Sequence, residues 1–288
     1  MLWFFMALVA AGGSAASDTL TKKFFSDFHS FEMGLIRLVY AAPFLLAGFL
    51  LVPRPPLDTT FWLCVGVNLP LETAALLCYM RAIKVSPLSL TIPFLAFTPA
   101  FVILTGRLFL GEVLNPPGLL GIGLVVTGSY VLNLSQARSR WFAPIAAVFR
   151  EQGSWLMLIT GFLFSFTATL GKVGILHSSP PFFAVTYFSC LLFLMLLLAP
   201  FIPGVRFRNL IARPLPALAC GVAAGVMIFS HYLAISLVEA AYMLSVKRMN
   251  LLFGVILGAL VFHETRIRER LTGALIMIAG VFLIGLFS

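Results

Sequence analysis

The chain has 288 residues, of which 61% are hydrophobic and only 10% are charged, and its mean hydropathy is +1.06. A soluble domain carries about 25% charged residues because its surface must face water, so this composition excludes a soluble protein and predicts a membrane protein. The net charge of +9 does not indicate a nucleic-acid partner, because the basic residues stand singly in loops between apolar runs. The four cysteines lie inside apolar runs without a CxxC spacing. We therefore expect no disulfide, no metal and no cofactor.

Ten apolar runs are long enough to cross a bilayer, since a helical span needs about 20 residues. In chain order they are 1–20, 31–52, 61–80, 88–110, 117–134, 155–176, 181–202, 214–237, 240–262 and 271–287. The sequence therefore predicts an all-α polytopic membrane protein with ten transmembrane helices. The longest polar stretch separates the fifth run from the sixth.

The segment 106–128, GRLFLGEVLNPPGLLGIGLVVTG, has a counterpart 152 residues later, GALVFHETRIRERLTGALIMIAG. We predict a first five-helix repeat at 1–135, a linker at 136–154 and a second repeat at 155–288. An odd number of spans makes the second copy enter the membrane from the opposite side, so the repeat is inverted. The matched positions are Gly106 with Gly258, Glu112 with Glu264, Gly121 with Gly273, Gly128 with Gly280 and, at a shift of 150, Lys22 with Lys172.

Basic residues are distributed unevenly between the loops. The odd-numbered loops hold most of the lysines and arginines, whereas Arg54 is alone in the even-numbered loops. The positive-inside rule then places the odd-numbered loops in the cytoplasm and both termini outside. We predict a multi-pass protein of the cell (inner) membrane.

Two five-helix copies that each end in helix, glutamate, short loop and glycine-rich helix resemble the EamA branch of the drug/metabolite transporter superfamily. The resemblance is carried by GRLFLGE and GALVFHE, by the lysines that close the first helix of each copy, and by YMRAIKVSPLSLTIPF at 79–94. It covers nearly the whole chain and implies a ten-helix transporter with a central cavity between its halves. Members of the family move amino acids, nucleotide sugars, metabolites or drugs. This chain departs from the pattern at Leu251, which stands where the first copy has Pro99, and relatives are usually drawn with cytoplasmic termini.

The run 240–262 carries Lys247, Arg248 and Asn250, where the first copy has apolar residues and a threonine. Ionisable groups at membrane depth cost about 2.5–3.5 kcal/mol each on insertion scales, and they usually face a cavity or a partner. We interpret these three residues as a binding site for an anionic group. The alternatives are a structural pairing with Glu72 and snorkelling toward an interface.

Other candidate substrate-binding residues lie in the second, third and eighth runs. Helical spacing places Asn68, Glu72 and Tyr79 on one face. Glu72 is interpreted as a counter-ion of the cations or as a proton-coupling residue. The further candidates are His231 and Tyr232, interpreted as cavity-lining hydrogen-bonding groups, and Arg37, which pairs with Asp18 or Glu72 or binds substrate.

A second group of residues is expected to have a structural role. Asp18 and Lys22 are spaced i, i+4, which predicts a local pair at the end of the first helix. Glu112 and Glu264 are expected to hold the tight connections before the last helix of each copy. The glycines in the last helices are expected to allow close packing. The remaining residues of this group are Lys172, Gly121, Gly128, Gly273 and Gly280.

These observations favour a secondary transporter, with export as the favoured direction. The expected substrate is a small polar metabolite with a negative group, such as an amino acid or organic acid, carried by alternating access through a cavity lined by helices one, three, four, six, eight and nine. A lipid-phosphate or lipid-linked sugar flippase is the alternative within this class, and a non-transporting membrane scaffold or sensor is the alternative outside it. No HExxH or GxSxG motif is present, so an enzyme is not expected. The expected partners are the small-molecule substrate and the lipid bilayer, and the chain is expected to be a monomer or a weak homodimer.

Overall fold

The computed structural model describes residues 1–86, 94–134, 151–262 and 271–287, and within these ranges the elements are helices. The first half of the chain forms five of them: α1 (Leu2–Phe25), α2 (Ser30–Leu51), α3 (Thr59–Val85), α5 (Thr98–Leu110) and α6 (Pro116–Leu134). The second half forms α8 (Gln152–Leu176), α9 (Pro180–Leu198), η1 (Ala199–Phe201), α10 (Phe207–Leu210), α11 (Pro214–Ile235), α12 (Ala240–Lys247), α13 (Asn250–Phe262) and α14 (Leu271–Phe287). Most of the predicted linker lies outside the described residues.

Many of these helices have the length and apolarity of membrane spans. Among the described residues, six segments meet both conditions: Ser30–Leu51, Thr59–Val85, Gln152–Leu176, Pro180–Phe201, Pro214–Ile235 and Ala240–Leu257. Shorter apolar helices occur at Thr98–Leu110, Pro116–Val131 and Thr272–Phe287. The chain is a multi-pass helical membrane protein, and the number of ten spans stays a prediction.

The run 240–262 is predicted to form one transmembrane helix. The structure keeps an apolar span over Ala240–Leu257 but divides the helix into two parts. The structure ends α12 at Lys247 and begins α13 at Asn250. The Arg248 amide donates to the carbonyls of both Leu244 and Ser245, so the last turn of α12 tightens before the chain turns away. No proline causes this break.

A corresponding break separates residues 94–95 from α5, with a turn at 96–97. The repeat shift of 152 residues relates this turn to the turn at 248–249. At α5 a proline lies in the first turn, where its missing amide hydrogen is tolerated. The two halves therefore share a discontinuous helix at matching positions, although only the first has the proline.

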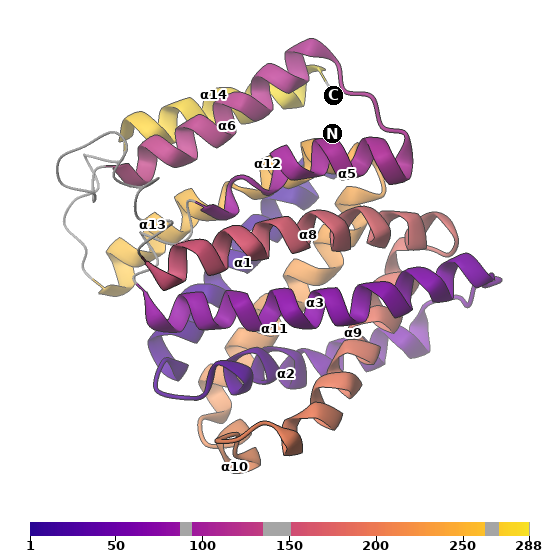
Figure 1. Cartoon of the computed structure of the whole chain (residues 1–288), viewed down its shortest axis with the longest axis vertical. Coiled ribbons are helices and arrows are strands. Elements are labelled where there is room, and N and C mark those ends of the chain that lie inside the picture. Colours follow the sequence, from indigo (N-terminus) through magenta and orange to yellow (C-terminus); the bar gives the residue numbers. More distant parts are fainter. Residues whose placement is uncertain (87–93, 135–150, 263–270, 288) are drawn as a thin grey trace.

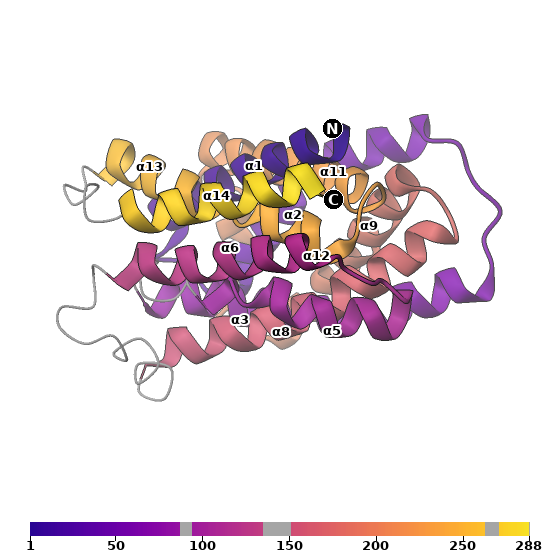
Figure 2. The same ribbon diagram turned by 90° about the horizontal axis from the view of Figure 1, so that it is seen from above.

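The two halves are interleaved rather than separate. Helix α1 packs against α11 and α3 packs against α8, so helices of different halves surround the middle of the bundle. Helices α6 and α14 lie together along one edge of the bundle (Figure 1). The view from above shows the same pair running side by side (Figure 2).

Glycines hold α6 and α14 close together. A Cβ atom at Gly121 would lie 2.9 Å from the Gly280 carbonyl oxygen, and one at Gly128 would lie 2.8 Å from the Gly273 carbonyl oxygen. Real Cβ atoms do not approach backbone atoms this closely. The four glycines therefore let the two helix backbones touch, as small residues do between membrane helices.

Replacing Gly128 by alanine should destabilise the protein. Its Cβ would lie 2.6 Å from the Met277 amide nitrogen, so α6 and α14 must separate, at a cost of about 1–3 kcal/mol. Thermal unfolding in detergent measures this loss. The matched control is Gly123→Ala on the same helix, where a Cβ meets nothing within 4 Å. Equal melting temperatures for the two variants would contradict the close contact.

Candidate functional site

A cavity of about 140 Å³ lies in the middle of the bundle. Since one water needs about 10–15 Å³ of such space, it has room for several waters or a small organic molecule. Its walls come from α1, α2, α3, α8, α9, α11, α12 and α13, with Leu95 preceding α5. It therefore involves both halves of the chain, and α2 and α9 contribute in addition to the expected helices.

Most of the residues predicted to bind substrate lie together on this cavity. They are Arg37, Glu72, Tyr79, His231, Tyr232, Lys247, Arg248 and Asn250. Asn68 is not part of the lining. Its Nδ2 atom donates to the Thr167 carbonyl oxygen at 3.4 Å, and its backbone carbonyl accepts from the Tyr187 hydroxyl at 3.3 Å. Its Oδ1 atom has no partner within the described ranges.

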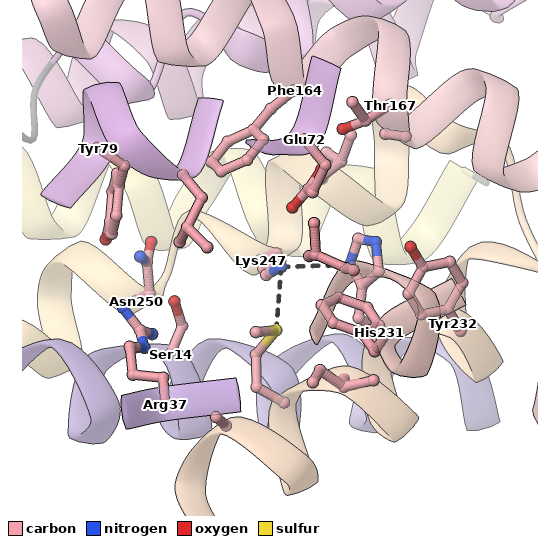
Figure 3. Close-up of a pocket in the computed structure, with 18 of the residues that line it drawn as sticks. Ser14, Arg37, Glu72, Tyr79, Phe164, Thr167, His231, Tyr232, Lys247 and Asn250 are labelled. Atoms are coloured by element: carbon pink, nitrogen blue, oxygen red, sulfur yellow. Dashed lines mark hydrogen bonds between the residues drawn. The ribbon is translucent and has the colours of Figure 1, made fainter. Parts of the chain in front are cut away.

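The cavity has two differently equipped ends. At one end Arg37, Ser14, Asn250 and Tyr79 converge, and at the other Glu72 lies near Thr167, with His231 and Tyr232 beyond (Figure 3). Lys247 lies between the two ends (Figure 3). Its Nζ atom is 3.2 Å from His231 Nδ1 and 3.6 Å from Met227 Sδ.

Arg248 occupies the break between α12 and α13. The residue is 4% exposed, and its Nε atom has no hydrogen-bond partner among the described residues. Asn250, the first residue of α13, is 5% exposed, and in the same described ranges its Oδ1 atom has no partner either. Burying a charge or a polar atom without a partner is costly. Both residues line the cavity, and each holds a buried polar atom without a partner among the described residues.

Arg37 is held by an acidic residue of another helix. Its Nη1 atom forms an ion pair with Asp18 Oδ1 at 3.0 Å, and the Tyr79 hydroxyl donates to Asp18 Oδ2 at 2.6 Å. Asp18 is thus directed to α2 and α3 rather than to the predicted partner Lys22. The Lys22 amino group donates instead to the carbonyls of Ile83 and Ser86, at 3.2 and 3.0 Å.

Glu72 lies on α3 and faces the cavity beside Thr167 (Figure 3). The hydroxyl groups of Thr167 and Tyr187 are its polar neighbours. Within the described part of the chain, none of the salt bridges involves Glu72. The carboxylate thus shares the cavity with Lys247 and Arg248 without a direct ion pair to either.

The structure adds lining residues that the sequence reasoning missed. Ser14 of α1 and Thr167 of α8 supply hydroxyl groups, and Phe164 and Phe188 supply aromatic walls. Phe164 and Thr167 are three residues apart, so a helical face is a signal that the sequence contains. That signal is weak, because serines, threonines and phenylalanines recur throughout this chain.

Glu112 joins three segments that are distant in the sequence. Its carboxylate forms an ion pair with Lys172 at 2.5 Å and accepts hydrogen bonds from the Ala240 amide at 3.0 and 3.1 Å. Lys172 also donates to the Val238 carbonyl at 2.6 Å. Glu112 therefore connects α5 of the first half to α8 and α12 of the second, in addition to any role in its own loop.

The lysines at the ends of α1 and α8 have matching hydrogen bonds. Lys22 donates to the Ser86 carbonyl and Lys172 donates to the Val238 carbonyl, and these carbonyls belong to positions related by the shift of 152. The two halves thus share the same lysine-to-carbonyl hydrogen bond at related positions. Glu264, the counterpart of Glu112, lies outside the described residues.

Comparisons with known proteins agree with this architecture. The model of the EamA-like transporter family matches residues 1–134 and 152–286. A search of curated proteins finds no match. A solved structure titled "Crystal structure of protein" has a TM-score of 0.72 and 12% sequence identity, and the match covers 99% of this chain and 96% of that one. At this identity the likeness shows the fold alone.

Replacing Asp18 by asparagine should destabilise the protein markedly. The side chains of Arg37 and Asp18 are only 9% and 6% exposed, and removing one charge from a buried pair costs about 3–5 kcal/mol. A thermal melt of the purified variant measures the loss.

The matched control is Asp27→Asn, in a pair outside the membrane-spanning segments. Its partner is Arg213 at 2.8 Å, with side-chain exposures of 57% for Asp27 and 40% for Arg213. The hydrogen bond from Arg213 lowers the pKa of Asp27, so this pair is formed at neutral pH. Its loss should cost less than about 1 kcal/mol. A smaller effect at Asp18 than at Asp27 would contradict the buried network.

Proposed function

Because the chain belongs to the EamA-like transporter family, we propose that it carries a small molecule with a negatively charged group across the membrane by alternating access. Membership of the family implies a membrane transporter of small molecules. The class of substrate and the mechanism are our proposal, and they rest on the central cavity.

Arg248 and Asn250 carry the argument for the substrate. A buried guanidinium attracts a carboxylate or phosphate, which accepts its hydrogen bonds. The unpartnered Asn250 Oδ1 atom is suited to a hydrogen-bond donor on the same molecule. An organic acid with a hydroxyl or amino group near its carboxylate supplies both. The substrate class that fits is therefore a small hydroxy or amino acid.

The balance of charge favours an anion as well. Asp18 neutralises Arg37, which leaves Lys247 and Arg248 against the single carboxylate Glu72 among the ionisable side chains that line the cavity. When Lys247 carries its proton, one positive charge is in excess. A buried excess charge is unfavourable at membrane depth, so a singly charged anion stabilises the loaded cavity.

Glu112 is suited to gating one entrance to the cavity. Its bonds to Lys172 and Ala240 tie the two halves together at one end of α5, α8 and α12. In our proposal these bonds break when that side opens, and the corresponding contacts of Lys22 belong to the opposite side. Inverted repeats rock about a central site in this way in other transporters. We propose that the odd-numbered loops are cytoplasmic, as the basic residues predict.

Matched acids and amides test the anion site. Propionate and lactate should raise the melting temperature of the purified protein, because a ligand that binds the folded state stabilises it. Propionamide and lactamide, which have nearly the same shape without the charge, should not. Equal stabilisation by acid and amide would contradict the proposal.

The variant Arg248→Met separates a binding role from a structural one. Because the buried Nε atom of Arg248 lacks a partner among the described residues, methionine should leave the ligand-free melting temperature unchanged or raise it. It should also weaken the stabilisation by lactate about tenfold or more in apparent affinity. Uptake of labelled lactate into proteoliposomes provides the functional measurement. The control is Lys23→Met, which removes an exposed lysine. A lower melting temperature with unchanged lactate binding would assign Arg248 to structure.

A further inference from the structure

We propose that the Lys247 amine, hydrogen-bonded to His231, is a proton-binding site that takes up one proton when the anionic substrate binds. This inference rests on the proposed function, because it concerns the same cavity. The step adds a solvent proton to the amine nitrogen and forms one N–H bond. No electron is transferred, and no other covalent bond is made or broken.

The partners of Lys247 suit a group that changes its charge. A lysine that is always charged in an apolar interior needs a carboxylate partner. The Nζ atom of Lys247 instead contacts an imidazole nitrogen, His231 Nδ1, at 3.2 Å and a thioether sulfur, Met227 Sδ, at 3.6 Å. In the part of the chain that the structure describes, no carboxylate forms a salt bridge with it.

The bond between Lys247 and His231 can survive both protonation states. When Lys247 is an ammonium group, it donates to the unprotonated Nδ1 atom of His231. When Lys247 is neutral, the imidazole can carry its proton on Nδ1 and donate to the amine, because the two tautomers of histidine interconvert. The local geometry is therefore retained when the proton leaves, which makes the change less costly.

Arg248 makes Lys247 the residue that releases a proton. The two cations are adjacent in the sequence and both line the cavity, so their charges repel. An arginine keeps its proton in proteins, whereas a buried lysine can lose its own. Relief of the repulsion must therefore come from Lys247.

Charged groups on four other elements decide when Lys247 is charged. The groups that act on Lys247 or bond to it are Asp18 on α1, Arg37 on α2, Glu72 on α3 and His231 on α11, together with Arg248. Asp18 and Arg37 form an ion pair, and Glu72 offsets Arg248. The empty cavity is then neutral if Lys247 is neutral. An anion that enters the cavity adds one negative charge, and protonation of Lys247 balances it.

A titration without substrate tests the proton site. Nuclear magnetic resonance of protein with ¹⁵N-labelled histidine rings follows His231 from about pH 5 to about pH 10, the span of the ordinary pKa values of histidine and lysine. We expect a change at Nδ1 that is absent in Lys247→Met and present in the surface control Lys23→Met. Identical curves for the wild type and Lys247→Met would overturn the assignment.

Proton uptake on binding tests the coupling. Lactate added to weakly buffered protein should draw about one proton per bound lactate into the wild type and into Lys23→Met, and none into Lys247→Met. Above the titration of this site, the apparent affinity for lactate should fall about tenfold for each unit of pH, since one proton is linked to binding. Glu72→Gln removes the charge that offsets Arg248, so proton uptake should fall in this variant, and Lys247→Met decides which residue holds the proton.

The outcomes distinguish the two proposals. If lactate binds the wild type without proton uptake, the coupling is wrong and the anion site stands. If uptake is lost in Glu72→Gln and kept in Lys247→Met, the proton belongs to Glu72, the residue that the sequence suggested, and our assignment fails. If no carboxylate binds, the proposed function fails, and the histidine titration still decides whether Lys247 is a proton site.

Discussion

The structure depends on how buried charge is balanced in the middle of an apolar bundle. Asp18 forms an ion pair with Arg37 and accepts a hydrogen bond from the Tyr79 hydroxyl, so the charge of Arg37 is already balanced. Arg248 is different, because its buried Nε atom has no partner in the part of the chain that the structure describes. Ionisable residues at membrane depth commonly mark a substrate or ion site. The break between α12 and α13 places this guanidinium at the cavity, and the transport proposal follows from that placement.

Symmetry and its local loss explain the arrangement around this charge. Both halves interrupt a helix at related positions, and both use a lysine to bind a related backbone carbonyl. At the cavity the two halves differ, because Arg248 in one corresponds to Ala96 in the other. A scaffold made of similar halves has similar energy when it opens to either side. Residues found in one half alone can then recognise a substrate that has no such symmetry.

The sequence predicted the class of protein and most of the polar residues that line the cavity, for a clear physical reason. A charged residue in an apolar run is costly to expose to lipid, so it usually faces a cavity or a partner. Lys247, Arg248 and Glu72 could therefore be assigned to an interior surface from the sequence. The break at 248–249 was not predictable, because the run has no proline or glycine there. The partners of the charged residues were predicted only in part. Spacing along a helix suggested Lys22 for Asp18. The sequence also offered Asp18 as one of two partners for Arg37, and packing between helices forms this pair. Glu112 was expected to serve its own loop, and its bonds to Lys172 and Ala240 depend on the tertiary fold.

The most direct test of the account is an experimental structure with an anion that can be identified by its scattering, such as 3-bromopropionate. We predict bromine density in the central cavity and a carboxylate within hydrogen-bonding distance of Arg248 Nε. An Arg248 side chain turned toward lipid, or bromopropionate bound elsewhere with the cavity closed, would contradict the account.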